Sequence, residues 1–265
     1  MNNNTTTSTE TNDIMNNGEN VKKGYYFGWS PIAMNMHWIA GIIILFASFM
    51  AFHLLPNFPP VTVLLAMIST MLFVGCCFIR TTVKEEFITL PYVDLFSQNS
   101  FGPVLDVGCG SGRTTIALSK VIGERPIVAL DRFDASYIQD GGKTLFEKNM
   151  EKAGISNRVQ IVNGNAENMK FEDGMFDAAV STNVLDHSQQ KLEILNEIYR
   201  VLKPEGRLLL NVMVPNLFTF AIAGPLCLVF IKKSAWRDLL GKSGFKLLDE
   251  GVVNNCTYFL VEKTS

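Results

Sequence analysis

The stretch VLDVGCGSG occupies residues 104–112. It begins as an apolar run that contains one carboxylate, Asp106, and it ends with glycines at alternate positions, Gly108, Gly110 and Gly112. Glycines at a strand-to-helix turn let the chain bend tightly, and the missing Cβ lets a ligand approach the backbone. A helix beginning at Arg113 would point free N–H groups at that ligand. The stretch therefore predicts a strand, a turn and a helix with a binding site at the turn.

After this turn, short β-branched runs alternate with helical periods, which is typical of a doubly wound α/β sheet. We expect strands at 103–107, 127–130, 158–162, 176–182, 206–211, 246–253 and 257–262. We expect helices at 113–122, 136–153, 188–202 and 234–243, with Ser188 as the N-cap of the third. The last two strands have no helix between them, so the sheet should close with a hairpin.

Asp131 ends the second expected strand, nineteen residues after Gly112. A carboxylate at that position can accept hydrogen bonds from both hydroxyls of a ribose, so the two features together predict a nucleoside-type ligand. Dinucleotide dehydrogenases carry the related pattern Gly-x-Gly-x-x-Gly. Here the third glycine comes one residue early and Arg113 occupies the later position. The spacing weakens the dinucleotide interpretation without excluding it.

The segment 104–112 resembles the first motif of the class I S-adenosylmethionine-dependent methyltransferase family. Later stretches resemble that family's further motifs in the same order: 163–169 (NGNAENM), 173–181 (DGMFDAAVS), 183–187 (NVLDH) and 197–210 (EIYRVLKPEGRLLL). The resemblance covers about residues 100–265. It implies a Rossmann-like seven-stranded sheet, S-adenosylmethionine as cofactor and methyl transfer as the reaction, but it does not identify the acceptor.

The resemblance also implies which residues bind the cofactor, all of them at the ends of strands. The implied set is Asp106, Gly108, Cys109, Gly110, Gly112, Asp131, Asn165, Ala166 and Asn183. Asp106 would help hold the methionyl ammonium by a charge-assisted contact, and Asp131 would bind the ribose. Asn165 and the Ala166 amide would contact the adenine edge, and Asn183 would lie beside the methionine moiety. The family usually has Asp at 165, so we expect somewhat weaker adenine selectivity, because an amide oxygen still accepts a hydrogen bond.

His187 is a candidate general base, because it is the only histidine outside the apolar N-terminal region. The alternative is a histidine that packs against or caps the next helix. Methyl transfer to an electron-rich nucleophile needs mainly alignment and little acid–base help. We expect Asp177 and Asp186 to be structural and the Cys109 thiol to be unactivated. Because no His or Cys cluster has metal-ligand spacing, we expect no metal.

Charge limits the partners of the chain. Charged residues make up 18% of its 265 residues and the formal net charge is −2, so nucleic-acid binding is not expected. Five cysteines, an odd number, are typical of reduced thiols and not of a disulfide framework.

The deficit of charge comes from one gap, since no Asp, Glu, Lys or Arg lies between Lys23 and Arg80. Two apolar blocks in it, 38–55 and 61–79, would each be about 28 Å long as helices, close to the ~30 Å core of a bilayer. We therefore expect two transmembrane helices, the alternative being two core helices of a soluble bundle. Basic residues flank both ends of this hairpin, so both ends and the catalytic domain should face the cytosol.

The chain divides into four expected regions. These are a disordered Asn/Thr-rich tail at 1–23, the hairpin at 24–80, a linker at 81–100 and the methyltransferase domain at 101–265 with an apolar insert at 215–233. The insert contains LFTFAIAGPLCLVFI at 217–231, which Gly224 and Pro225 interrupt. Too short to span a bilayer, it should form an interfacial or re-entrant element beside the active site, or alternatively a buried cap.

These features together predict an integral membrane methyltransferase that uses S-adenosylmethionine. Its partners would be the lipid bilayer and an apolar small-molecule or lipid acceptor. One alternative is a membrane-tethered module that binds S-adenosylmethionine without turnover. An NAD-dependent dehydrogenase is the less favoured alternative.

Overall fold

The computed structural model describes residues 24–28, 31–82, 95 and 102–264, except 137, 139, 218, 221–223 and 254–255. The expected tail at 1–23 and most of the expected linker at 81–100 lie outside the described residues.

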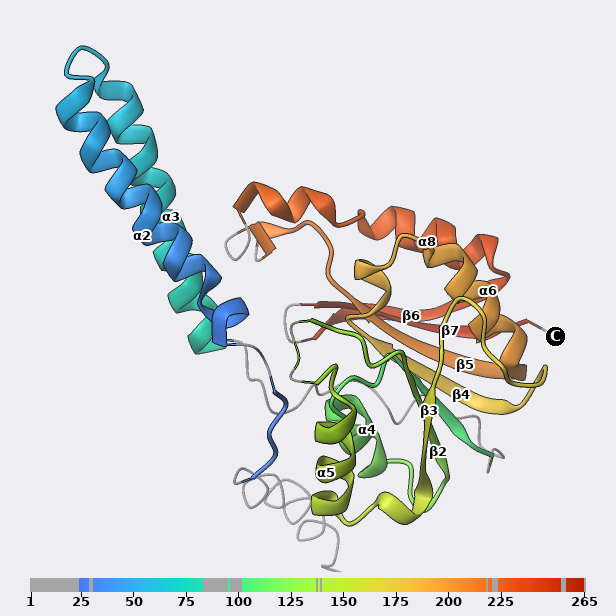
Figure 1. Cartoon of the computed structure of the whole chain (residues 1–265). Helices are drawn as coiled ribbons and strands as arrows, with labels where there is room; N and C mark the ends of the chain where they lie inside the picture. Colours follow the sequence, from blue (N-terminus) through green and yellow to red (C-terminus); the bar gives the residue numbers. More distant parts are fainter. Residues whose placement is uncertain are drawn as a thin grey trace, which may run out of the picture.

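A seven-stranded sheet forms the centre of the molecule, in the order β3-β2-β1-β4-β5-β7-β6 (Figure 1). The strands are β1 Val104–Val107, β2 Ile127–Asp131, β3 Val159–Asn163, β4 Phe176–Thr182, β5 Leu202–Val212, β6 Phe245–Val253 and β7 Cys256–Lys263. The first five pair in parallel, whereas β7 runs antiparallel to both β5 and β6. The predicted α/β sheet and its closing hairpin are confirmed.

Helices cover both faces of the sheet (Figure 1). They are α4 Arg113–Ser119 and α5 Lys143–Ala153 on one face, and α6 Lys191–Val201 and α8 Lys233–Lys242 on the other. Three short 3-10 turns connect elements: η2 Ser156–Arg158, η3 Leu185–His187 and η4 Gly224–Val229. Because both faces are covered, β1 and β4 can be apolar along most of their length, and nearly every residue in them is buried.

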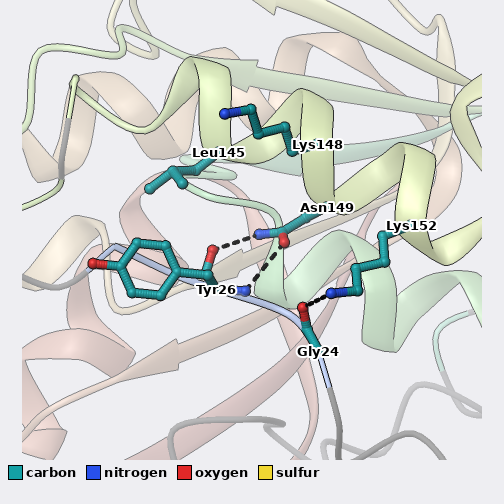
Figure 2. Close-up of a pocket in the computed structure, with 6 residues that line it drawn as sticks. All are labelled: Gly24, Tyr26, Leu145, Lys148, Asn149 and Lys152. Carbon is teal, nitrogen blue, oxygen red and sulfur yellow. Dashed lines mark hydrogen bonds between the residues drawn. The ribbon is translucent and has the colours of Figure 1, made fainter.

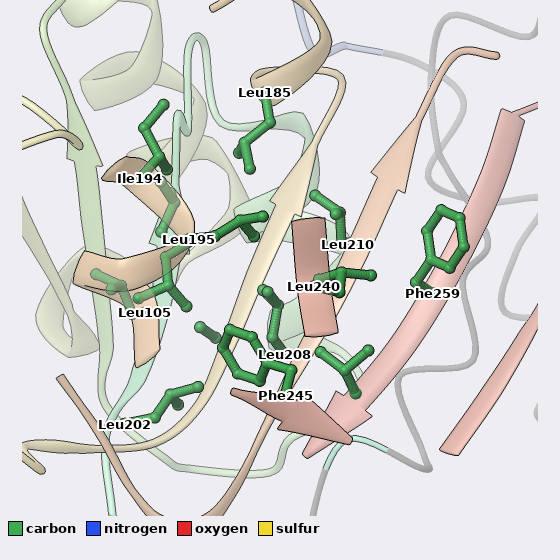
Figure 3. Packing of buried hydrophobic residues seen from close by; sticks show 14 of the residues in the cluster. Leu105, Leu185, Ile194, Leu195, Leu202, Leu208, Leu210, Leu240, Phe245 and Phe259 are labelled. Atoms are coloured by element: carbon green, nitrogen blue, oxygen red, sulfur yellow. The ribbon is translucent and has the colours of Figure 1, made fainter. Parts of the chain in front are cut away.

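Leucines of β5, α6 and α8 fill the larger core layer, which Figure 3 shows from close by. Leu208 and Leu210 of β5 pack with Leu195 of α6 and Leu240 of α8. On the other face, α4 and α5 contribute Ile116, Phe146 and other side chains of a separate buried cluster. The binding turn between β1 and α4 is thus supported by packed elements on both sides.

Two helices begin later than the sequence pattern predicts. Helix α5 begins at Lys143 and not at 136, because Gly141 and Gly142 have φ angles of 66° and 98°, outside the helical region. Helix α6 begins at Lys191 after Gln190, so Ser188 is not its N-cap. The Ser188 hydroxyl instead accepts a hydrogen bond from the Gln190 N–H at 3.0 Å.

The apolar N-terminal region forms a helical hairpin of α2 Pro31–Leu54 and α3 Pro59–Thr82, which extends away from the sheet (Figure 1). The two helices pack closely around Gly41, whose carbonyl accepts a 2.9 Å hydrogen bond from the Ser69 hydroxyl. Trp38 and Phe73 lie in ring contact across the same interface, with centroids 5.0 Å apart. The predicted hairpin is therefore present.

Within the residues that the structure describes, no helix combines the length and apolar character needed to cross a membrane. The expectation of two transmembrane helices is thus not supported, although the expected helical hairpin is.

Candidate cofactor site

The turn between β1 and α4 needs glycine at each alternate position. Gly108, Gly110 and Gly112 have φ angles of 76°, 53° and 92°, in the left-handed region that favours glycine. A Cβ at Gly108 would overlap the side chain of Val184, and a Cβ at Gly112 would come within 2.5 Å of Met150. The turn therefore packs between Val184, just after β4, and Met150 of helix α5, and a side chain at either glycine would collide with them.

Asp106 is a buried carboxylate with one oxygen free for a ligand. Its Oδ2 accepts a 2.6 Å hydrogen bond from the Thr115 hydroxyl of α4, and its Oδ1 has no partner among the described residues. Burial raises the pKa of Asp106 to about 7; the Thr115 bond opposes this rise and the charge of Asp131 adds to it. A buried carboxylate with an unpartnered oxygen is best satisfied by a cationic group, so the residue fits the ammonium of S-adenosylmethionine.

Asp131 lies at the end of β2 with both carboxylate oxygens oriented by backbone donors. Its Oδ2 accepts from the Gly110 N–H at 2.8 Å and its Oδ1 accepts from the Phe133 N–H at 2.8 Å. Each carboxylate oxygen can still accept a second hydrogen bond. The position links the glycine turn to β2 and suits the predicted contact with a ribose.

The end of β3 lies next to Asp131. The Gly164 N–H donates to the Asp131 carbonyl at 3.0 Å, which brings Asn165 and Ala166 to the same edge of the sheet. The Asn165 Oδ1 faces only the Glu167 N–H, at 3.5 Å, and Ala166 is partly buried against the core. The predicted residues that follow β1, β2 and β3 thus lie at one edge of the sheet.

The ends of β4 and β5 carry further polar atoms without partners. Asn183 has a positive φ of 55°, and its N–H donates to the Asn211 carbonyl at 2.8 Å. Among the described residues, the Thr182 Oγ1, the Asn183 Oδ1 and both amide atoms of Asn211 are buried and unpaired. Unpaired buried polar atoms at the carboxyl ends of parallel strands are typical of a ligand site.

Asp186 and His187 follow directly in η3. Asp186 is almost fully buried; its Oδ2 accepts from the Met213 N–H at 3.3 Å, and its Oδ1 is unpartnered among the described residues. Burial is the main cause that raises the pKa of Asp186. The His187 Nε2 lies 3.9 Å from the Asp186 Oδ2, and the imidazole contacts the Phe230 ring of the insert with centroids 6.4 Å apart. Both residues thus stand between the sheet and the insert, and the catalytic role of His187 stays a prediction.

Cys109 lies within the turn but has no sign of an activated thiol. It is buried, and burial raises its pKa, so the thiol stays protonated at neutral pH. In the described part of the chain, no three His, Cys, Asp or Glu side chains gather in a group that could hold a metal ion.

Some described residues of the insert are buried and others are exposed. Thr219 and Cys227 are buried, whereas the side chains of Leu217, Leu228 and Val229 stay largely in solvent. The described part of the insert is therefore not a fully buried cap.

Sequence reasoning missed two contributors to the site. One is Thr115, whose hydroxyl donates a hydrogen bond to Asp106. Its place in the first turn of α4, next to the glycine turn, could have suggested this contact. The other is the stretch Gly24–Gly28, which the sequence groups with the hairpin. In the structure the backbone N–H and carbonyl of Tyr26 form two hydrogen bonds with the side-chain amide of Asn149 in α5 (Figure 2). No local pattern connects positions 123 residues apart, so this contact had no sequence signal.

Comparisons with known proteins agree with this geometry. Residues 105–210 match the family described as "Methyltransferase domain". The "Ubiquinone/menaquinone biosynthesis C-methyltransferase UbiE" of Pectobacterium carotovorum is 37% identical over 106 residues, which cover 40% of this chain and 40% of that protein. The chain thus matches well under half the length of that curated relative.

Two solved structures share the fold. A S-adenosylmethionine-dependent methyltransferase from Aquifex aeolicus aligns with a TM-score of 0.56 and 18% identity, over 71% of this chain and 97% of its own. The 1,6-didemethyltoxoflavin-N1-methyltransferase of Burkholderia thailandensis, whose structure holds S-adenosylhomocysteine, aligns with a TM-score of 0.51 and 17% identity, over 68% of this chain and 80% of its own. Residues 105–210 therefore match a methyltransferase domain, and the chain shares the fold of both solved methyltransferases.

Proposed function

We propose that the chain transfers a methyl group from S-adenosylmethionine to an apolar acceptor that resides in a membrane. The observation that carries the proposal is the buried, unpartnered Oδ1 of Asp106 beside a turn whose three glycines have positive φ angles. When bound, the sulfonium supplies an electrophilic methyl group. The protein's part is to hold the cofactor through Asp106 and Asp131 and to align the acceptor with it.

The polar end of the acceptor would bind among the unpaired atoms beyond β4 and β5. Asn211 offers a donor and an acceptor atom, and Asp186 offers an oxygen that can take up a proton from the acceptor. The raised pKa of Asp186 supports this role, because a carboxylate with a raised pKa holds a proton more readily near neutral pH. His187 beside it is the alternative proton acceptor.

The apolar part of the acceptor would lie along the insert and the membrane surface. Large apolar side chains cover the outside of the hairpin, among them Ile43, Phe46 and Phe52, with 62%, 64% and 64% of their surface exposed. A patch of this kind on a protein surface marks a contact with a partner or a lipid phase. We propose that the hairpin anchors the chain to a bilayer with the catalytic domain on the cytosolic side, because Lys22, Lys23 and Arg80 flank it.

Transfer of a radiolabelled methyl group into a total lipid extract tests the proposal. The full chain, reconstituted in lipid vesicles with labelled S-adenosylmethionine, should place label in an apolar fraction, and the Asp131→Ala variant should not. Label in no lipid fraction would overturn the lipid acceptor.

Calorimetric titration with S-adenosylmethionine and with NAD separates the alternatives. Binding of S-adenosylmethionine without transfer to any acceptor tried would favour the module without turnover. Tight binding of NAD with none of S-adenosylmethionine would overturn the proposed activity itself.

A further inference from the structure

The chain just before the hairpin crosses the catalytic domain next to the cofactor turn. We call the stretch Gly24–Gly28 the strap. Its Phe27 is 93% buried, since only 7% of its surface is exposed, and belongs to one cluster with Cys109 of the turn and Phe146 of α5. Lys152 of α5 donates a hydrogen bond to the Gly24 carbonyl, which holds the other end of the strap (Figure 2).

Asn149 is the polar centre of this contact. Its side chain is buried, with 3% of the residue exposed, and its amide contacts the strap (Figure 2) and also the cofactor turn. The Oδ1 accepts from the Tyr26 N–H at 3.3 Å, and the Nδ2 donates to the Tyr26 carbonyl at 3.0 Å. The same Nδ2 donates its second hydrogen to the Ser111 carbonyl at 2.8 Å.

Ser111 lies between Gly110 and Gly112, so the second bond fixes the backbone that faces the cofactor. An amide nitrogen has two hydrogens, and Asn149 uses one for each segment. Displacement of the strap would leave one donor and one acceptor of the Asn149 amide unpaired in a buried position. Because such unpaired groups cost free energy, the amide would turn toward other partners and lose its bond to Ser111. The strap and the turn therefore share one buried residue.

We propose that Asn149 is a positioning residue that couples docking of the strap to cofactor binding, so that each event stabilises the other. The proposal rests on the proposed function for its ligand, S-adenosylmethionine. Reciprocity is required, because a coupling free energy acts equally in both directions. Helix α2 begins at Pro31, three residues after the strap, so the same contact links the cofactor turn to the hairpin.

Hydrogen exchange and calorimetry on the full detergent-solubilised chain test the coupling. S-Adenosylmethionine should slow exchange in the peptide that contains Tyr26, although no atom of the strap needs to touch the cofactor. Asn149→Ala should abolish that protection and weaken cofactor binding about tenfold, the effect of losing one buried hydrogen-bond network. Lys148→Ala, an exposed neighbour on α5, should preserve both.

A second variant keeps the test valid if Asn149→Ala does not fold. Phe27→Ala leaves α5 and the turn intact and removes the apolar contact of the strap, so it should also weaken cofactor binding several-fold. The coupling is wrong if S-adenosylmethionine binds to the wild-type chain without changing exchange at Tyr26, or if both variants bind it as the wild type does. Absence of binding to the wild-type chain would instead overturn the proposed function.

Discussion

At the scale of single residues, the proposed contact between Asp106 and the cofactor predicts that cofactor affinity depends on pH. Burial raises its pKa to about 7, so the group is mostly neutral at pH 6 and mostly charged at pH 8. A cation beside it binds better to the charged form. The affinity for S-adenosylmethionine, measured by calorimetry, should therefore rise as the pH increases from 6 to 8.

The Asp106→Asn variant is the control for this effect, because an amide does not titrate in that range. Its affinity should be weaker and nearly independent of pH. The stability of the cofactor-free fold should change with pH in the opposite direction. The folded-state pKa of Asp106, about 7, lies above the ordinary 3.8, so its contribution to stability is fully present below pH 4 and is lost as the pH rises through 7. A wild-type affinity that does not change with pH would contradict the ammonium contact.

Asp131 should matter for affinity more than any other exposed or half-buried carboxylate of the β2–α5 connection. Asp131→Ala removes the ribose acceptor and both bonds that orient Gly110 and Phe133, so binding should weaken by at least about 1.5–3 kcal/mol. Asp134→Ala is the matched control, because Asp134 is exposed and pairs only with Arg132 among the described residues, at 3.5 Å. Equal affinities of the two variants in calorimetry would show that the ribose site is elsewhere.

Asp186 and His187 can be separated by their effects on turnover. Asp186→Asn should lower kcat at least tenfold with little change in cofactor affinity, because the carboxylate faces the acceptor side and general-base catalysis contributes ~100-fold or more. His187→Gln should cost less, since 57% of that side chain is exposed. Steady-state kinetics with S-adenosylmethionine and the unmethylated acceptor from the lipid fraction that takes up label measures both. An unchanged kcat in both variants would leave alignment as the sole source of catalysis.

At the scale of elements, the turn between β1 and α4 depends on its packing as well as on its φ angles. Gly112→Ala would place a Cβ on a residue with a φ of 92° and against the Met150 side chain. Gly123→Ala would also place a Cβ on a residue with a positive φ, 63°, but no atom lies within 4 Å of that Cβ. The second change should cost about 1–2 kcal/mol in unfolding free energy and leave cofactor binding intact. The first should cost more and weaken binding. Denaturant unfolding and calorimetry on both variants check this, and equal costs would mean that α5 does not restrain the turn.

The sheet could be predicted from the sequence because its strands are short, buried and separated by clear breaks. The run FDAAVST matches β4 at both ends, and the closing hairpin follows from the absence of a helical stretch between the last two runs. The beginning of α5 was wrong by seven residues, because Gly141 and Gly142 interrupt a pattern whose apolar spacing continues through them. Apolar periodicity locates a helix better than it locates its first turn.

The candidate site was predictable only where it is local. Asp106, the glycines and Asp131 lie in or beside one continuous motif, and the structure brings them together through bonds such as Gly110 N–H to Asp131. The strap and Asn149 were not predictable, because their contact joins distant segments and leaves no periodic pattern. Asp186 was expected to be structural, yet its unpartnered oxygen is apparent only once burial is known.

At the scale of the whole molecule, the strap connects the apolar hairpin to the cofactor turn. The strap leaves the catalytic domain at Gly28, and α2 begins at Pro31 and carries the apolar surface away from the sheet (Figure 1). The insert follows β5 at the carboxyl edge of the same sheet, where the ligand of a parallel sheet binds. A bilayer that holds the hairpin would therefore lie within reach of the edge where the acceptor must enter.

Replacement of the outer phenylalanines of α2 by aspartate tests this arrangement. Phe46, Phe49 and Phe52 are each at least 59% exposed, and burial of three such side chains in lipid is worth ~5–9 kcal/mol, apart from the added cost of charge. The triple variant should move from the pellet to the supernatant when sedimented with phosphatidylcholine–phosphatidylglycerol vesicles. It should keep its affinity for S-adenosylmethionine, because these exposed side chains belong to none of the buried clusters of the catalytic domain. Val121→Asp, at an exposed apolar position beside α4, should stay with the vesicles as the wild type does. If the triple variant also sediments with the vesicles, the hairpin is not the anchor, and the exposed leucines of the insert become the next surface to test.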